Sequence, residues 1–462
     1  MKFHARKFLP VLFLLLPVLI SLPVIVCPAL GAPQAAARVR FADIERLPQD
    51  GVSYLPADPD APIADFANQI AYAEAYLVRH FAPWQASDLS FLGITFRELA
   101  AFHNSTARRR WYSSDGTQIT RAYIDAIVRN GAINESAVPR RGVMILPDDV
   151  RILPYGRSVY GSRSSALGLN GLLRLDILQL STARPGEPLA MFHASADLNW
   201  VFVATGTVAG WVRNSSVAVV DDEFIDRVMS SDMAVIAHDN VEVTGGDGRL
   251  LYRLKLGTVL PTEDGKVLLP VRGGRAFADL AMYEFAPGAA QPFPIKFTPR
   301  NAALAIDQMV GETYGWGGSS GLRDCSALTR DYFALFGIWL PRNSRAQARV
   351  GELVSLENIS VNERSGAITS QGVPFATLLQ MPGHIMLYIG TRGGEPLVFH
   401  NIWGVRLRGN GRAVVGRAVI STLRLGAEIP NRLENSLLLD RLTVMSFPME
   451  ELSACPSSVN NE

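Results

Sequence analysis

The spacing of apolar residues changes twice along this chain, so different kinds of domain must follow one another. Three stretches before residue 141 have the spacing of amphipathic helices: 66–78, 89–103 and 120–130. From 141 to 285, short apolar or alternating runs are separated by turn residues, which is typical of small β-barrels. After a proline-rich linker at 286–299, a helical pattern precedes strand patterns, which indicates an α+β domain.

These patterns predict a multidomain fold, and 462 residues suffice for it at roughly 150 residues per domain. The expected order is a mostly helical N-terminal domain at 33–137, one small β-barrel at 138–225, a second at 226–290 and an α+β domain at 291–450. Residues 172–175 are expected to form a strand of the first barrel, and residues 352–372 a loop near the cleft of the last domain. The polar residues 451–462 are expected to form a disordered tail.

The N-terminus predicts export. Lys2, Arg6 and Lys7 precede a long apolar stretch and then small residues, which is the pattern of a secretory signal over residues 1–32. The alternative is a membrane anchor, because the apolar stretch is about long enough to span a bilayer. Cys27 lies where a lipid-modified cysteine would lie, although Val26 before it is larger than a lipoprotein signal prefers. We therefore expect the periplasm or cell envelope, with possible membrane attachment through the N-terminus.

Cys325 is the strongest candidate for chemistry. The chain has three cysteines, and the other two lie in the signal and in the polar tail, as Cys27 and Cys455. A Cys325–Cys455 disulfide is the structural alternative to a reactive thiol. Cys325 follows a glycine-rich loop at the start of a predicted helix, where free N–H groups and the helix dipole favour a thiolate and are expected to lower its pKa. Asp324 before it is either a helix cap or a substrate contact.

A cysteine nucleophile needs an imidazole base that a third polar group holds in place. Only His384 and His400 follow Cys325, at the start of one predicted strand and the end of the next. Antiparallel pairing of these strands would bring the two rings together. The alternative is a buried structural histidine. The remaining histidines lack metal-ligand spacing, so we predict no metal and no cofactor. The net charge of +1 gives no basic surface for nucleic acid.

Four features together resemble the NlpC/p60 cysteine peptidases: YGWGG at 314–318, DCS at 324–326, GHIMLYIG at 383–390, and His400. The resemblance implies a papain-like α+β domain with Cys325 as nucleophile, His384 as general base and His400 as the orienting residue. It also implies that Tyr314 helps to stabilise the oxyanion. One departure from the family is Gly383, where a serine is common.

The upstream sequence resembles a subgroup with an N-terminal clip-like domain and two bacterial SH3 domains. The resemblance implies hydrolysis of the bond between γ-D-glutamate and a diamino acid, diaminopimelate or lysine, in peptidoglycan stem peptides. It further implies a free N-terminal L-Ala on the substrate, whose amino end would contact Asp324 and Ser326. Tyr155 and Tyr160 are candidates for the contacts that the first SH3 domain makes.

Two other functions stay open at this point. An N-acetylmuramoyl-L-alanine amidase or another thiol acyl-transfer enzyme would use the same thiol and imidazole on the same fold. A non-catalytic wall-binding protein would use its SH3 domains instead, with an inert C-terminal domain.

Overall fold

The computed structural model describes residues 39–449. The predicted signal peptide, Cys27 and the tail with Cys455 lie outside these residues. No helix of the described part is long and apolar enough to cross a membrane.

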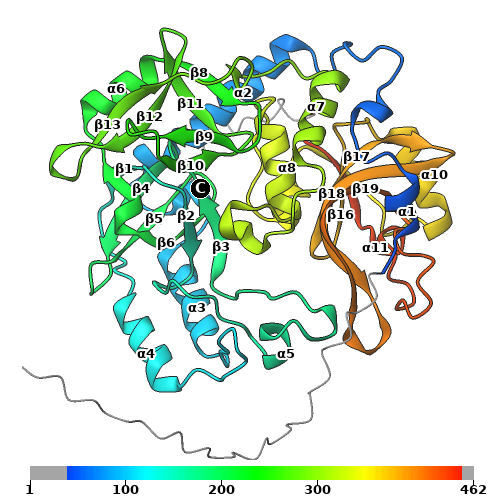
Figure 1. Ribbon diagram of the computed structural model, residues 1–462, viewed down its shortest axis with the longest axis horizontal. Coiled ribbons are helices and arrows are strands. Elements are labelled where there is room, and N and C mark those ends of the chain that lie inside the picture. The colour runs from blue at the N-terminus through cyan, green and yellow to red at the C-terminus, as the bar shows by residue number, and fades with distance from the viewer. Residues whose placement is uncertain (1–38, 450–462) are drawn as a thin grey trace, which may run out of the picture. The chain divides into compact units, whose positions relative to one another are not determined.

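The N-terminal region is helical, as predicted, and side chains cap its α-helices except the first. It contains α1 (Ala42–Arg46), α2 (Phe66–Phe81), α3 (Phe96–Ala107) and α4 (Arg121–Asn130) (Figure 1). Thr95 forms a capping box with Glu98 at the start of α3. The expected helix at 89–103 therefore begins later, because Gly93 adopts a left-handed conformation (φ 67°) and ends a short 3₁₀ turn.

The N-terminal region packs on other parts of the chain. Gln69 of α2 is buried, and its Nε2 donates to the carbonyls of Ile295 (2.6 Å) and Phe336 (3.1 Å) near the C-terminal domain. Phe96 of α3 meets Phe192 of the first β-region edge-to-face, with ring centroids 5.1 Å apart. The helices thus pack against both the first β-region and the C-terminal domain.

The first β-region is a seven-stranded antiparallel sheet with the order β3-β2-β6-β5-β4-β1-β7. Its strands are β1 (Arg140–Met144), β2 (Asp148–Arg151), β3 (Gln179–Ala183), β4 (Pro188–Ala194), β5 (Trp200–Ala204), β6 (Ala209–Arg213) and β7 (Val217–Val219). Phe202 and Trp211 are fully buried in its core. The strand expected at 172–175 is wrong. This stretch is irregular and follows α5 (Arg163–Ala166) and a left-handed turn at Asn170 and Gly171.

The second β-region begins after α6 (Asp222–Ser230) and contains a five-stranded sheet with the order β13-β12-β11-β8-β14. The strands are β8 (Asp232–Ile236), β11 (Val259–Glu263), β12 (Lys266–Arg272), β13 (Ala278–Tyr283) and β14 (Ala290–Pro292). A separate hairpin consists of β9 (Val241–Thr244) and β10 (Leu250–Leu254).

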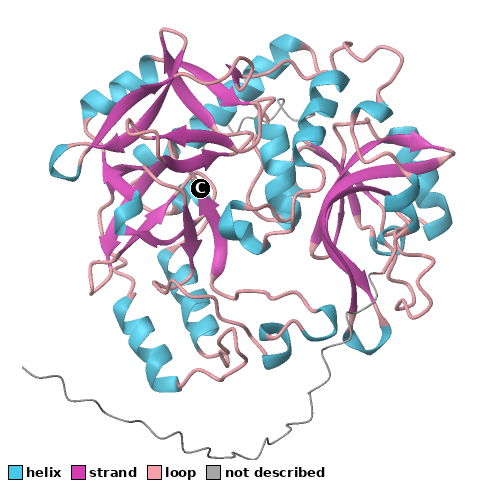
Figure 2. Ribbon diagram, viewed as in Figure 1, coloured by secondary structure: helices cyan, strands magenta, loops and turns pink. Residues whose placement is uncertain are grey.

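The C-terminal domain places helices on a six-stranded antiparallel sheet with the order β15-β20-β16-β17-β18-β19 (Figure 2). The strands are β15 (Glu352–Ser355), β16 (Leu378–Met381), β17 (His384–Arg392), β18 (Glu395–Arg406), β19 (Arg412–Thr422) and β20 (Val444–Phe447). The helices are α7 (Pro299–Met309), α8 (Cys325–Ala334), α9 (Ser344–Gln347), α10 (Val361–Gln371) and α11 (Leu438–Arg441). The expected loop at 352–372 is wrong, because it forms β15 and α10.

Helix α8 is the element that positions the site. It lies against β17 and β18, and its apolar face joins the main core of the domain through the fully buried side chains of Leu328 and Tyr332. The Tyr332 hydroxyl donates to the Phe375 carbonyl (2.7 Å), so the one polar atom of this ring is satisfied. Anchoring along α8 therefore holds its first residue, Cys325, beside the start of the central strand β17.

Candidate active site

Cys325 is the first residue of α8 and is preceded by a capping aspartate. The Asp324 carboxylate accepts hydrogen bonds from the backbone N–H groups of Ala327 (2.8 Å) and Gly317 (3.1 Å). Gly317 and Gly318 have φ values of 61° and 82°, which a non-glycine residue rarely adopts, and this lets the preceding loop fold back onto Asp324. The Ile385 backbone N–H, at the start of β17, lies near enough to the Cys325 sulfur to act towards a lower pKa of the thiol. Among the described residues Cys325 forms no disulfide, and Ile385 beside it directly follows His384.

His384 and His400 lie in neighbouring strands, β17 and β18, and their rings are in direct contact. His384 Nε2 and His400 Nδ1 are 2.8 Å apart, and His400 Nε2 is 3.1 Å from Ser421 Oγ of β19. The Ser421 hydroxyl donates to the Thr422 carbonyl (2.9 Å), so its oxygen accepts from His400 Nε2–H. His400 Nδ1 then accepts from His384 Nε2–H. This chain of donors leaves His384 Nδ1 unprotonated, as a base requires.

Tyr314 approaches the site from the segment before the glycine loop. Its backbone N–H donates to the Gly416 carbonyl (2.9 Å), and its ring meets Trp403 edge-to-face with centroids 6.1 Å apart. Burial raises the pKa of Tyr314 well above its ordinary value, and ionised Cys325 and the Asp324 carboxylate act in the same direction. The phenol therefore keeps its proton and can serve as a hydrogen-bond donor.

The expected low pKa of Cys325 is wrong. Burial, and then the neighbouring Asp324 carboxylate, raise the pKa of Cys325 to about 12, although the N–H groups of Ile385 and Ser326 act in the opposite direction. Burial and the Arg441 charge lower the pKa of His384 to about 4. The resting pair is therefore a neutral thiol beside a neutral imidazole, because loss of water outweighs the helix dipole at this depth.

Arg342 holds the two residues that flank the nucleophile. Its Nη2 donates to Asp324 Oδ2 (2.8 Å), its Nη1 to Ser326 Oγ (2.9 Å) and its Nε to Ser181 Oγ of β3 (2.9 Å). The guanidinium thus ties the first β-region to the start of α8. Sequence reasoning missed Arg342 and Ser421. An arginine directly after the apolar run at 338–341 was an available signal, whereas nothing local distinguishes Ser421.

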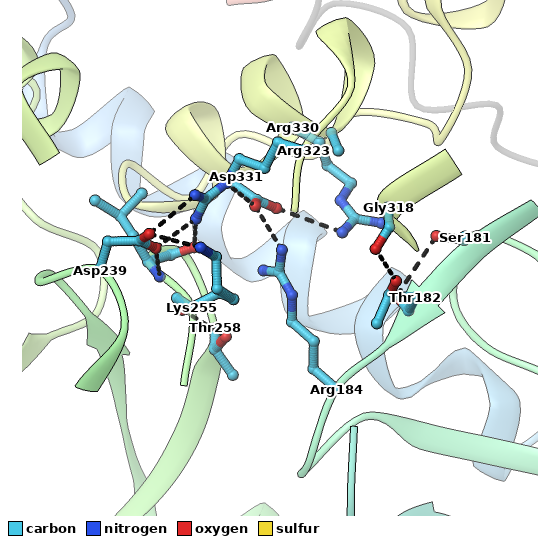
Figure 3. A network of polar contacts seen from close by, with 12 residues as sticks. Ser181, Thr182, Arg184, Asp239, Lys255, Thr258, Gly318, Arg323, Arg330 and Asp331 are labelled. Atoms are coloured by element: carbon cyan, nitrogen blue, oxygen red, sulfur yellow. Dashed lines mark hydrogen bonds and ion pairs between the residues drawn. The ribbon is translucent and has the colours of Figure 1, made fainter. Parts of the chain in front are cut away.

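Arg323, two residues before Cys325, is the centre of a buried ionic network (Figure 3). Its side chain is 1% exposed and donates to Asp331 (2.6 Å), Asp239 (2.7 Å) and Glu312 (2.9 Å). Lys255 also bonds Asp239 (2.6 Å) and Glu312 (2.8 Å). Asp239 and Lys255 belong to the second β-region, so this network joins that region to the segment before the nucleophile.

A cavity of about 550 Å³ lies at the same junction, away from the catalytic residues. Arg184, Arg330 and Arg342 line it, whereas Cys325 and His384 do not. Arg184 and Arg330 both approach the Asp331 carboxylate (Figure 3). The cavity therefore belongs to the domain junction on the other side of α8.

The described contacts of the two remaining sequence candidates, Tyr155 and Tyr160, do not include Cys325. Tyr155 packs edge-to-face on Tyr123 of α4, with centroids 5.9 Å apart. Tyr160 is buried beneath Arg174, whose guanidinium lies 5.3 Å from the ring centroid. These described contacts are with the N-terminal helices and the first β-region rather than with Cys325. Gly383 has φ 83°, so the turn before His384 suits glycine better than serine.

Comparisons with known proteins identify three parts of the chain. Residues 9–135 match the model of the N-terminal stabilising domain of NLPC_P60 proteins, residues 173–213 an SH3 domain of the SH3b1 type, and residues 311–408 the NlpC/P60 family. No curated protein matches the chain. These matches confirm the resemblance and the predicted fold class.

Solved structures are similar to this chain to different extents. An NlpC/P60 endopeptidase from Photobacterium damselae subsp. piscicida is 25% identical, with a TM-score of 0.77 over 87% of this chain and 98% of that one. An NlpC/P60 family protein from Bacillus cereus is 16% identical, with a TM-score of 0.43 over 67% of this chain and 99% of that one. The peptidoglycan hydrolase RipB from Mycobacterium tuberculosis is 21% identical, with a TM-score of 0.18 over 32% of this chain and 62% of that one.

Replacing Arg323 with methionine is expected to destabilise the protein. It leaves Asp239, Glu312 and Asp331 buried without the cation they share, and breaking a buried pair in this way lowers the free energy of unfolding by about 3–5 kcal/mol. Chemical denaturation at pH 7 measures the change. Arg300→Met, which removes an exposed pair with Asp60, is the matched control and is expected to leave the midpoint unchanged. A wild-type midpoint for Arg323→Met would contradict the structural role of the network.

The acid limit of activity is expected to depend on Arg441. His384 acts as a base only when neutral, and its pKa of about 4 predicts that kcat/KM holds as pH falls from 7 and declines near 4. Arg441→Gln removes a charge that lowers the His384 pKa, so the decline shifts to higher pH. Arg408→Gln, whose exposed side chain pairs with Glu434, is the control.

Stability must be followed across the same pH series. Burial depresses the folded-state pKa of both His384 and His400, so the stability that depends on their neutral forms is present above their unfolded pKa and is lost as pH falls towards 4. Circular dichroism at each pH separates unfolding from titration. An acid limb at the same pH in Arg441→Gln and wild type, with both proteins folded, would contradict the assignment of His384 as the titrating base.

Proposed function

Because the chain carries an NlpC/P60 domain, we propose that it is a cysteine peptidase that hydrolyses the bond between γ-D-glutamate and a diamino acid in peptidoglycan stem peptides. The diamino acid is diaminopimelate or lysine. One observation carries this proposal: Cys325 lies at a helix start beside Ile385, which follows His384, and the His384–His400–Ser421 chain leaves a free nitrogen on His384. The match to an NlpC/P60 endopeptidase along 87% of the chain supports it.

The reaction starts from the neutral pair. His384 Nδ1 takes the thiol proton as the Cys325 sulfur attacks the carbonyl carbon of the γ-amide. The Tyr314 hydroxyl and the Cys325 backbone N–H donate to the developing oxyanion. The proton on His384 then passes to the departing amine, which leaves a thioester on Cys325. Water, deprotonated by His384, hydrolyses this thioester and restores the thiol. His400 and Ser421 hold the imidazole in the required tautomer throughout.

The amino end of the substrate is assigned to Asp324 and Ser326. A free N-terminal L-Ala would place an ammonium group near the Asp324 carboxylate, which it would share with Arg342. Tyr155 and Tyr160 remain candidates for further contacts in the first β-region. We also propose that the protein acts in the periplasm or cell envelope after export, with attachment through a lipidated Cys27 as one form. An SH3 domain beside a hydrolase of this family fits an extracytoplasmic site of action.

The decisive experiment is product analysis by mass spectrometry. The mature protein is incubated with free L-Ala-γ-D-Glu-diaminopimelate and, separately, with intact sacculi. Release of L-Ala-D-Glu from the peptide is expected, and Cys325→Ala is expected to abolish it while the protein stays folded. Intact stems freed from glycan would instead identify an amidase. Sacculus binding without any cleavage would identify a wall-binding protein.

Tyr314→Phe tests the oxyanion donor. Loss of one donor that acts mainly in the transition state is expected to lower kcat about 10²–10³-fold with little change in KM. Trp339→Phe, at a site where the indole lies under Arg79, is the control for aromatic substitution. A kcat within twofold of wild type in Tyr314→Phe would remove Tyr314 from the mechanism.

A further inference from the structure

Charges of opposite sign act on the catalytic histidine. Burial and then the Arg441 guanidinium lower the pKa of His384, whereas the Asp324 carboxylate acts to raise it. Arg441 is the last residue of α11, and its Nη2 donates to the carbonyl of Pro382 (3.1 Å), two residues before His384. The base therefore has an acidic neighbour at the start of α8 and a basic neighbour at the end of α11. A peptide with an ammonium group at one end and carboxylates at the other would match this polarity.

Arg441 belongs to a group of three arginines, Arg406, Arg412 and Arg441, which we call the arginine cluster. Arg406 of β18 and Arg412 of β19 are direct cross-strand partners in the β18–β19 hairpin (Figure 1). Burial and the charges of Arg406 and Arg412 lower the pKa of Arg441, and burial and the charge of Arg406 lower that of Arg412. The three guanidinium groups are therefore close enough to repel one another.

No carboxylate among residues 39–449 pairs with the arginine cluster. In this part of the chain Arg441 and Arg412 donate only to backbone carbonyls (3.1 and 3.0 Å). The neighbouring Arg408 differs, because it pairs with Glu434. Like charges placed directly opposite each other on two strands destabilise a sheet. The fold thus keeps a repulsive pair without a described acid to offset it, which leaves the cluster available to an anionic ligand.

Strand β18 leads from the catalytic residues to the arginine cluster. Its residue His400 contacts His384 (2.8 Å), and the strand ends at Arg406. Of the three arginines, only Arg441 acts on the pKa of His384. The cluster therefore begins beside the base and extends away from it. Its position suits a substrate group that lies at some distance from the bond that is cut.

The two candidate diamino acids differ by one carboxylate. Diaminopimelate carries a carboxylate and an ammonium group at the far end of its side chain, whereas lysine carries the ammonium group alone. Guanidinium groups bind carboxylates through two parallel hydrogen bonds and repel an ammonium group. The other carboxylates of the two stem peptides are the same. An unpaired group of arginines therefore distinguishes the peptides through the side-chain carboxylate.

We propose that Arg406, Arg412 and Arg441 bind the side-chain carboxylate of the diamino acid and thereby select diaminopimelate over lysine. This inference rests on the proposed function, because it concerns the leaving half of that substrate. The amino end of the same peptide is assigned to Asp324, so the polarity of the substrate follows the polarity of the site. A lysine peptide would instead place an uncompensated ammonium group against the cluster.

Three peptides isolate the side-chain carboxylate. In them L-Ala-γ-D-Glu is followed by diaminopimelate, by diaminopimelate amidated at its side-chain carboxyl, or by lysine. The wild-type protein is expected to cleave the first with a kcat/KM at least about tenfold higher than that of either other peptide, the effect of losing hydrogen bonds between charged groups. Equal kcat/KM values for the three peptides would overturn the proposal.

Arg406→Gln and Arg412→Gln are the informative variants, because neither arginine acts on the pKa of His384. Each is expected to lower kcat/KM for the diaminopimelate peptide about tenfold and to leave that for the lysine peptide within about twofold. Arg406→Glu is expected to raise kcat/KM for the lysine peptide. Arg408→Gln removes an arginine that is already paired and is expected to keep the wild-type preference. A wild-type preference in both Arg406→Gln and Arg412→Gln would overturn the proposal.

Thermal stability separates a binding role from a structural one. Repulsion between Arg406 and Arg412 predicts that Arg406→Gln melts at or above the wild-type temperature. An arginine retained for the fold would instead lower the melting temperature when it is replaced. A lower melting temperature with an unchanged preference between peptides would assign the cluster to the fold and overturn its binding role.

Binding measurements distinguish this inference from the proposed function. Isothermal titration calorimetry of the Cys325→Ala protein with the three uncleaved peptides is expected to show the highest affinity for the diaminopimelate peptide. Such selective binding by a protein whose wild-type form cleaves none of the peptides would retain the arginine site and reject the peptidase. Cleavage of all three peptides with equal kcat/KM and equal affinity would retain the peptidase and reject the arginine site.

Discussion

The position of the nucleophile depends on one buried arginine. The Arg323 side chain binds carboxylates from α8, the segment after α7 and the second β-region, while its carbonyl accepts from the Gly315 N–H (2.9 Å) and from the Asn401 side chain of β18 (2.8 Å). Buried ion pairs are weak contributors to net stability, because desolvation offsets much of their attraction. The positions of the paired groups are tightly constrained, however, because displacing one partner leaves the other as an uncompensated buried charge. The network thus specifies where the chain enters α8, and Cys325 follows two residues later.

The exclusion of water that requires every charge of this network to be paired also determines the protonation states of the catalytic residues. Low polarity raises the pKa of the Cys325 thiol and lowers that of His384, so both are neutral at rest. A thiolate at a helix start would need solvent or a strong cation to stabilise it, and Arg342, whose charge acts on Cys325, is already paired with Asp324. The site is therefore made ready for catalysis by the fixed tautomer of His384 and not by a thiolate on Cys325. Ser421 and His400 orient one lone pair of His384 towards proton transfer, and the thiolate forms as attack occurs.

Patterns within short stretches of sequence predicted the helices, strands and catalytic residues, whereas features that depend on contacts between distant segments were missed. Helical spacing located α2 and α4, strand patterns located β17 and β18, and the order of Cys325, His384 and His400 identified residues that the structure brings together. The misses share a cause. Residues 172–175 look like a strand by composition, but they form no strand in the described structure, and Trp403 binds the carbonyl of the preceding Gly171. Arg342, Ser421 and the raised Cys325 pKa all depend on contacts between segments far apart in sequence, which no local pattern encodes.

Access and activation are coupled in such a site. The pKa values of Cys325 and His384 lie far apart because the cleft is closed, and the burial that separates them comes from the elements packed around the site. Water admitted to the site would lower the thiol pKa and raise the imidazole pKa, bringing the two together. A bound peptide that replaces this water would preserve the low polarity in which the Tyr314 hydroxyl stabilises an oxyanion most strongly. Closure over substrate thus favours the charge formed in the transition state, while opening without substrate would expose a thiol that is easier to ionise. The elements packed around the site therefore keep Cys325 protonated at rest, and the thiolate forms only as the sulfur attacks a bound peptide.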